Sequence, residues 1–246
     1  MNHEKPVANH STGSRQSNQG FSTYNEKSLH ADLKAWHAQP GDEIEVPVDG
    51  YVIDIVRGNL LIEIQTRNFS ALKLKLDRLV ENHPVRLVYP IAREKWLVRL
   101  AEDGQTSLGR RKSPKRGSYL QIFEELVSFP GLMAEDNFEL ELLLIREEEV
   151  RWRSYKRRWR RQGWVTIERR LLEVVDQQVI ETPEDLVALL PPLPDRPFTT
   201  SDLARIIEGP RRLAQKVAYC LREMGAIQAE GKQGNAILYV VGQNGE

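Results

Sequence analysis

The sequence has 246 residues but only one cysteine, Cys220. A single cysteine excludes an internal disulfide bond and every zinc site built from several cysteines, which fits a reducing, cytoplasmic location. No apolar run approaches the roughly 18 residues that a membrane helix requires, so no membrane association is expected. The N-terminal segment lacks the apolar core of a signal peptide, and residues 1–22 are expected to be a disordered tail.

The chain also lacks an excess of charge of either sign, because 35 basic residues balance 35 acidic ones. Any attraction to nucleic acid must therefore come from local clusters of basic residues. With 40% hydrophobic and 28% charged residues, the composition is typical of a soluble globular protein with one large or two ordinary domains. The composition does not define an oligomeric state.

Apolar spacing and turn residues predict a mixed α/β domain over residues 23–180. Helices are expected over 25–38, where Leu29, Leu33 and Trp36 recur at helical spacing, and over about 69–81 and 118–127. Strands are expected within 43–66, at 85–89 and 95–100, and in the alternating segment 138–145. Residues 107–117 are expected to be a loop.

The segment 43–66 is rich in Val, Ile and Leu and contains two tight-turn signatures. Asp49-Gly50 is typical of a type I′ hairpin turn, and Gly58-Asn59 has the leading glycine that a type II′ turn requires. The two turns predict a three-stranded antiparallel meander with a defined register. In that register one face is an apolar layer of Ile44, Val46, Val48, Tyr51, Ile53, Ile55, Leu60, Ile62 and Ile64.

The opposite face of the meander carries an acidic row, in which Glu45 faces Asp54 and Asp54 faces Glu63. Like charges directly opposed destabilise a sheet, so stability alone does not favour this row. Oxygen-rich clusters of this kind bind Mg²⁺ or Mn²⁺. The alternative is a solvated face whose acids pair with nearby lysine or arginine. Three apolar residues share the face and suggest that something covers it: Val52, Val56 and Leu61.

Residues 25–100 resemble the core of the PD-(D/E)XK nuclease superfamily. In that core an aspartate on one strand and Glu-x-Lys on the next lie between two helices, and here Ile53-Asp54 and Glu63-Ile64-Gln65 occupy these places. The resemblance implies a restriction-endonuclease-like mixed sheet flanked by helices. It also implies a metal-dependent DNA nuclease with Mg²⁺ or Mn²⁺ as cofactor.

The same resemblance assigns roles to individual residues. Asp54 and Glu63 would bind the metal, and the backbone carbonyl of Ile64 would be a further ligand. Glu26 would be the acid of the first helix. The register adds Glu45 to the metal-binding row.

Two positions depart from the family pattern. Ile53 replaces the proline, and Gln65 replaces the lysine that orients or activates the attacking water. Some members of the superfamily look similar in carrying Gln there, and others move the lysine to the following helix, where Lys73 or Lys75 could serve. His30 could face the acids, although a lone helical histidine is more often a surface or packing residue.

Two segments are strongly basic. In "RWRSYKRRWRR", residues 151–161, seven of eleven residues are basic, and three aromatic residues would form a stripe on a helix. Nucleic-acid contact is one interpretation, and a packed helix whose arginines pair with the acids at 147–149 is the other. The expected contacts are Arg157, Arg158 and Arg160. The segment "RRKSPKR", residues 110–116, is expected to be a mobile phosphate-contacting loop or a solvated one.

After the stiff segment "PPLPDRP", the pattern predicts a winged helix-turn-helix module over residues 182–246. Thr199 and Asp202 form a capping-box signature, a second helix begins at Pro210, and a hairpin follows. Such a module binds DNA through its second helix and its wing, or it contacts protein. The expected DNA contacts are Arg211, Arg212, Gln215, Lys216 and, in the wing, Lys232.

These observations favour a DNA endonuclease or nuclease-like DNA-processing protein, in which the winged helix positions the substrate. Two alternatives stay open. One is a catalytically inactive nuclease fold that binds DNA or regulates, which the Gln at position 65 supports. The other is a protein-interaction scaffold.

Overall fold

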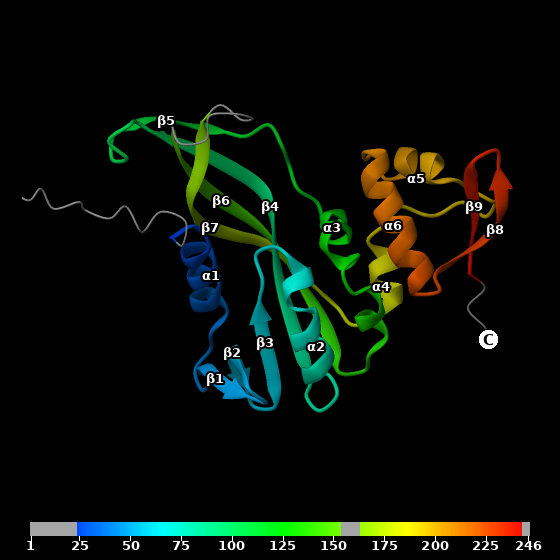
Figure 1. The fold of residues 1–246 in the computed structure, drawn as a ribbon, viewed down its shortest axis with the longest axis horizontal. Coiled ribbons are helices and arrows are strands. Elements are labelled where there is room, and N and C mark those ends of the chain that lie inside the picture. Colours follow the sequence, from blue (N-terminus) through cyan, green and yellow to red (C-terminus); the bar gives the residue numbers. More distant parts are fainter. Residues whose placement is uncertain (1–23, 154–162, 243–246) are drawn as a thin grey trace, which may run out of the picture.

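The protein is described by a computed structural model for residues 24–153 and 163–242. Within these residues the chain forms a mixed α/β structure in which helices flank a large sheet (Figure 1). The strands of this sheet are β1 (Glu43–Val48), β2 (Tyr51–Arg57), β3 (Leu60–Ile64), β4 (Val85–Leu100), β5 (Ser107–Lys112), β6 (Phe138–Arg153) and β7 (Trp164–Ile180). They lie in the order β1-β2-β3-β4-β6-β7, and β5 pairs with β4. The expected mixed sheet flanked by helices is therefore confirmed.

Most helices of the sheet region are short. They are α1 (Tyr24–His37), η1 (Phe69–Ala71), α2 (Lys73–Leu79), η2 (Tyr119–Ile122), α3 (Phe123–Leu126) and η3 (Pro130–Ala134). The helices expected over 69–81 and 118–127 each begin as a 3-10 turn and continue as a short α-helix. Among residues 24–153 and 163–242, no helix combines the length and the apolar character needed to cross a membrane.

The meander forms with the turns that the sequence predicts. Asp49 and Gly50 have positive φ angles of 48° and 82°, and Gly58 has a φ of 62°. Val48 pairs with Tyr51 and Arg57 pairs with Leu60, so each two-residue turn closes its hairpin. The predicted register is confirmed for the paired residues of β1, β2 and β3.

The expected faces of the meander are correct only in part. Glu45 has a φ of 55° and leaves the ladder between β1 and β2. Residues two apart on a strand normally face the same side of the sheet. Here, however, Ile53 packs in the core cluster that contains Leu76 of α2, whereas Ile55 packs in the cluster that contains Leu33 of α1. The orientation of the side chains of β2 therefore changes between these two residues. Ile44, expected in the apolar layer, is 46% exposed. A single continuous acidic row therefore does not form.

Alternate residues of β4 and β6 face opposite sides of the sheet and pack against different helices. On one side, Leu87 and Leu140 share a core cluster with Leu76 of α2. On the other side, Val88 shares a cluster with Leu33 of α1. The sheet thus lies between α1 and α2, and β4 runs parallel to β3 and to β6.

The sequence analysis is wrong about several strands. Residues 85–100 form one strand with a bulge between Ala92 and Glu94, not two strands. Half of the expected loop 107–117 is strand β5, which pairs with β4. Arg151, Trp152 and Arg153 extend β6 instead of starting a helix, because they pair with the unpredicted strand β7. Arg157, Arg158 and Arg160 lie outside the described residues.

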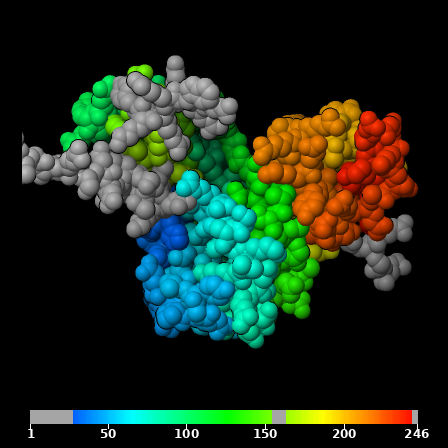
Figure 2. Space-filling model, viewed as in Figure 1, coloured from blue at the N-terminus to red at the C-terminus, as the bar shows by residue number. Residues whose placement is uncertain are grey.

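The C-terminal module contains α4 (Pro183–Ala188), α5 (Thr200–Ile206), α6 (Arg211–Glu223) and a hairpin of β8 (Ile227–Gln233) and β9 (Ala236–Val241). The capping box of Thr199 and Asp202 forms as predicted. One hydrophobic cluster includes both Phe123 of α3 and Val217 of α6. Figure 2 shows the module, orange to red, seated against the green segment that contains α3.

Candidate functional site

Asp54 on β2 and Glu63 on β3 lie close together at the end of the meander nearest the middle of the sheet. The Asp54 carboxylate accepts a hydrogen bond of 2.9 Å from the N–H of Ile64, which ties β2 to the end of β3. The Glu63 side chain is 7% exposed and that of Asp54 is 15% exposed. The structure therefore brings together two of the predicted acids and the backbone of Ile64.

A lysine from α2 completes this cluster. Lys75 donates to Glu63 Oε1 at 2.5 Å and to the carbonyl of Val52 at 2.7 Å. Lys73 is an exposed residue that pairs with Asp77 on its own helix at 3.2 Å. Of the two lysines that the resemblance offers, the structure places Lys75 beside the acids. Asp54, Glu63 and Lys75 are called the acid–lysine site below.

Helix α1 contributes two further side chains, His30 and Lys34, to the same acids. His30 Nε2 lies 2.8 Å from Asp54 Oδ1, and Lys34 Nζ lies 3.7 Å from that oxygen. Lys34 also contacts Glu45 at 2.5 Å, and Glu45 itself is 65% exposed. The sequence analysis missed Lys34, although its place four residues after His30 puts both on one helix face.

Two other predicted residues take no described part in the site. The Gln65 side chain donates to the carbonyl of Asn68 at 3.3 Å instead of contacting the acids. Glu26 belongs to α1, but its side chain lies outside the described part of the chain.

The two acids differ in their electrostatics. Burial opposes ionisation of Asp54, but hydrogen bonds from His30 and the Ile64 N–H outweigh it and lower the pKa of Asp54. For Glu63 burial dominates over the contact with Lys75, so its pKa is raised. The nearby negative charge of Asp54 also raises the pKa of Glu63. The site thus holds one firmly ionised carboxylate beside one that binds protons more readily.

The donor chemistry of this site fits a hard divalent cation. Two carboxylates and the Ile64 carbonyl are oxygen donors, and Mg²⁺ typically takes one or two carboxylates and completes its shell with waters and substrate phosphates. No group of three or more His, Cys, Asp or Glu side chains within residues 24–153 and 163–242 is arranged to hold a metal ion. A cation bound here would therefore depend on water and substrate for most of its ligands.

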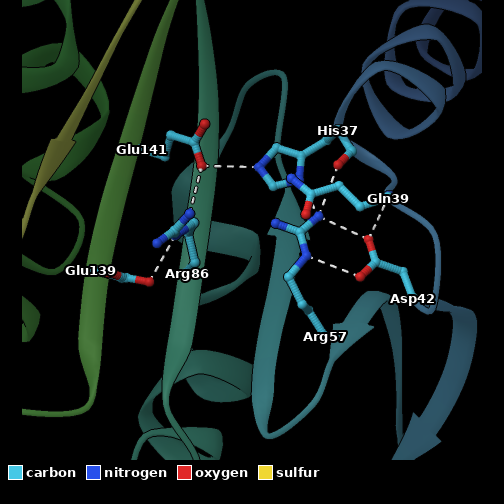
Figure 3. Close-up of polar contacts among 7 residues, drawn as sticks. All are labelled: His37, Gln39, Asp42, Arg57, Arg86, Glu139 and Glu141. Atoms are coloured by element: carbon cyan, nitrogen blue, oxygen red, sulfur yellow. Dashed lines mark hydrogen bonds and ion pairs between the residues drawn. The ribbon is translucent and has the colours of Figure 1, made fainter.

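The C-terminal end of α1 is held by the network shown in Figure 3. His37 Nε2 lies 2.9 Å from the Glu141 carboxylate, which also accepts from Arg86 at 3.4 Å. Arg57 makes two bonds to Asp42, at 2.9 and 2.8 Å, and donates to the carbonyl of His37 at 2.9 Å. These contacts fix α1 on the sheet and thereby position His30 and Lys34. The adjacent Trp36, which shares the helical spacing of the buried Leu29 and Leu33, is 43% exposed.

A second charged cluster lies farther along β4. Lys95 contacts the buried Glu147 and Glu149, each at 2.8 Å. Glu149 also accepts hydrogen bonds from Arg151 at 2.7 Å and from Thr166. Burial opposes ionisation of Glu149, but these three donors outweigh it and lower its pKa to about 2. The ionised carboxylate therefore stabilises the fold.

Replacing Glu149 by Gln is expected to remove a stabilisation that depends on pH. Because the folded pKa is near 2 and the ordinary value is 4.5, the ionised Glu149 stabilises the fold fully above pH 4.5, and this is lost as pH falls through 2. Glu149→Gln should lower the free energy of unfolding at pH 7 by on the order of 2–3 kcal/mol. Urea unfolding at pH 7 and pH 3 measures this. A variant whose deficit is the same at both values would contradict the role of the charge.

Of the five residues of the C-terminal module that are predicted to contact DNA, four are exposed and one contacts the sheet region. Arg211, Arg212 and Gln215 are exposed on α6, and Lys232 is exposed on β8. Lys216 instead donates to the carbonyl of Glu124 in α3 at 2.7 Å. Lys216 therefore fastens α6 to the sheet region.

The part of the chain that carries the acid–lysine site defines a family. The chain belongs to the family described as "Domain of unknown function (DUF8091)", whose model matches residues 27–181, from α1 to just past the end of β7. It is similar to an "Uncharacterized protein" of Treponema pallidum (strain Nichols). The two are 32% identical over 222 residues, which cover 89% of this chain and 86% of that protein. No solved structure matches the chain.

Proposed function

We propose that the protein is a divalent-metal-dependent DNA nuclease with a PD-(D/E)XK-like core. The observation that carries this proposal is the placement of Lys75 at 2.5 Å from Glu63, with Asp54 on the neighbouring strand. The element order supports it as well. Helix α1, the meander β1–β3, helix α2 and the parallel strand β4 follow in the order that the resemblance implies.

Asp54, Glu63 and the Ile64 carbonyl would hold the metal, whereas Glu45 is 65% exposed and would not be a main ligand. Bound there, Mg²⁺ or Mn²⁺ would supply a water of lowered pKa and charge for the phosphate. Lys75 contributes a fixed ammonium group at the same place, which can orient that water or hydrogen-bond a phosphate oxygen. His30 holds the Asp54 carboxylate in position.

The C-terminal module is proposed to be a winged helix that positions the substrate. Its α4, α5 and α6 precede the β8–β9 hairpin, and the outer side of α6 presents cations. Arg211 and Gln215 are exposed there, and Arg222 lies 5.8 Å over the ring of the 40% exposed Tyr219. Arginine and tyrosine in this arrangement suit contacts with phosphates and bases.

A second candidate is a DNA-binding protein with the same fold and no turnover. It is favoured by the cations that already accompany the acids. Asp54 contacts His30 and Lys34, and Glu63 contacts Lys75, so the negative charge of the site is balanced within the chain. Gln65 also leaves the usual lysine position without a cation.

A cleavage assay separates these candidates. Wild-type protein and Asp54→Asn are incubated with single-stranded, duplex and branched DNA and with RNA, in Mn²⁺ and in EDTA. Cleavage of DNA only by the wild type and only in Mn²⁺ is the expected result. Mn²⁺ at ten times its dissociation constant should also stabilise the wild type by roughly 1.4 kcal/mol.

Other outcomes have distinct meanings. Binding of DNA without cleavage, together with no melting shift in Mn²⁺, would favour the second candidate. Equal Mn²⁺ shifts in wild type and Asp54→Asn would show that the metal binds elsewhere. Cleavage of RNA alone would contradict the proposed substrate.

A further inference from the structure

A hollow of about 490 Å³ opens along β4 beside strand β5 and the loop that follows it. Its lining contains five basic side chains and no acidic one: Lys95, Arg111, Lys115, Arg116 and Arg151. This feature is called the basic hollow below. It includes much of the segment 110–116 that the sequence analysis singled out, and none of its lining residues belongs to the acid–lysine site.

The loop that forms one wall of the basic hollow is anchored at both ends. The N–H of Ser113 donates to the carbonyl of Lys95 at 2.7 Å, and the N–H of Gly117 donates to that of Ala92 at 3.0 Å. A Cβ atom on Gly117 would lie 2.6 Å from the Ala92 oxygen, so only glycine allows this approach. The wall is therefore tied to the sheet by strand β5 and by these two backbone hydrogen bonds.

Strand β5 divides its cations between two faces, as alternation along a strand requires. Arg110 contacts Glu148 at 2.7 Å and Lys112 contacts Glu94 at 2.5 Å, and both lie about 5 Å from the ring of Trp96. Arg111, between them, faces the hollow. The cations on one face are paired, whereas Arg111 on the other has no ion-pair partner among the described residues.

The floor of the basic hollow is balanced, whereas its wall is balanced only at Arg116, which lies 3.8 Å from Glu94. Lys95 and Arg151 contact Glu149 beneath them, and Lys95 also contacts Glu147. Within the described residues Arg111 and Lys115 form no salt bridge, and both are exposed. The uncompensated charge thus lies at the open wall, where it can meet a ligand without displacing an internal carboxylate.

We infer that the basic hollow binds the phosphodiester backbone of nucleic acid through Arg111 and Lys115. An arginine fork and a lysine ammonium above a floor whose charges are already paired match phosphate oxygens, and no acidic side chain lines the hollow to repel them. The inference rests on the proposed function for the class of ligand. It concerns a contact surface separate from the acids, so binding here requires neither metal nor cleavage.

The test compares two double variants with equal loss of charge from one strand and its loop. Arg111→Gln with Lys115→Gln removes the free cations of the hollow, and Arg110→Gln with Lys112→Gln removes the paired cations of the opposite face. Binding of a fluorescent DNA duplex is measured in EDTA between 50 and 200 mM salt. Losing two phosphate contacts should reduce the slope of log K against log salt by about 1.8. Over that range the wild type should then lose roughly 12-fold more affinity than the first variant.

The Arg110→Gln, Lys112→Gln variant should keep the wild-type salt slope. The melting temperature of the Arg111→Gln, Lys115→Gln variant should be close to that of the wild type. An equal loss of salt slope in both variants would overturn the inference, because binding would then depend on the overall charge of the protein and not on the hollow. A wild type that binds no duplex in EDTA, or binds phosphatidylserine vesicles instead, would overturn it too. A wild type that binds the duplex through the hollow but cleaves no DNA in Mn²⁺ would leave the inference standing, so failure of the nuclease proposal is distinguishable from failure of the inference.

Discussion

Replacing Lys75 by Met is expected to reduce metal-dependent cleavage at least ~100-fold, the loss seen when one fixed donor to a developing charge is removed. The reason is its position. Lys75 contacts Glu63 at 2.5 Å and is 15% exposed, so its charge acts in surroundings where water screens it little. Initial rates on the best DNA substrate in Mn²⁺, with binding measured in EDTA, give the effect.

Lys73→Met is the matched control, because the same side chain is removed from the same helix. Lys73 is 51% exposed and pairs with Asp77, so its loss should leave the cleavage rate near that of the wild type. The melting temperature of Lys75→Met can fall because Glu63 loses its partner. In that case Lys75→Gln, which keeps a hydrogen-bond donor, is assayed in place of Lys75→Met. Equal cleavage rates for the folded Lys73 and Lys75 variants would show that Lys75 has no part in cleavage.

Replacing Val217 by Asp should unfold more than the module that contains it. Val217 is fully buried in α6, in the core cluster that also includes Phe123 and Leu87. An unpaired carboxylate there should cost at least ~3 kcal/mol, and each kcal/mol lowers the melting temperature of a chain this size by roughly 2–4 °C. Because the cluster is continuous, the sheet should unfold at the same lower temperature as α6.

Tryptophan fluorescence measures the unfolding of the sheet region alone, because all five tryptophans precede residue 165 and none lies in the C-terminal module. Two independent domains would leave the tryptophan melt of Val217→Asp unchanged, which would contradict a shared core. Arg211→Ala is the control on the same helix, since an exposed side chain should change stability by no more than ~0.5 kcal/mol. If α6 contacts duplex DNA, that variant should still lose about 0.9 in salt slope.

Local chemistry made the meander predictable. Type I′ and II′ turns need particular residues at Asp49-Gly50 and Gly58-Asn59, so their positions define the pairing of β1, β2 and β3. The capping box at Thr199 was predictable for the same reason, because Thr199 and Asp202 satisfy backbone groups within one turn. The resemblance to the nuclease superfamily brought Lys75 into consideration, although it could not separate Lys75 from Lys73.

The remaining features depend on contacts between distant segments. Strand β7 shows no clear alternation, because its partly exposed residues pair with β6 on one side only. The extension of β6 through Arg151 follows from that pairing. His30 and Lys34 reach Asp54 only because the network at His37 and Glu141 fixes α1 on the sheet. The four-residue spacing puts His30 and Lys34 on one helix face but does not show which strand that face meets, and Glu45 leaves the ladder at a position that turn residues do not specify.

Strand β4, which is continuous apart from the bulge between Ala92 and Glu94, sets the interval between two places. Leu87 lies beside Glu63, and Lys95 lies on the floor of the basic hollow eight residues farther along the same strand. At roughly 3.3 Å per residue this span is about 26 Å. B-form DNA rises about 3.4 Å per base pair, so the span equals about eight base pairs, less than one helical turn. If one DNA duplex is bound at both places, as proposed, a duplex shorter than about eight base pairs could reach only one of them.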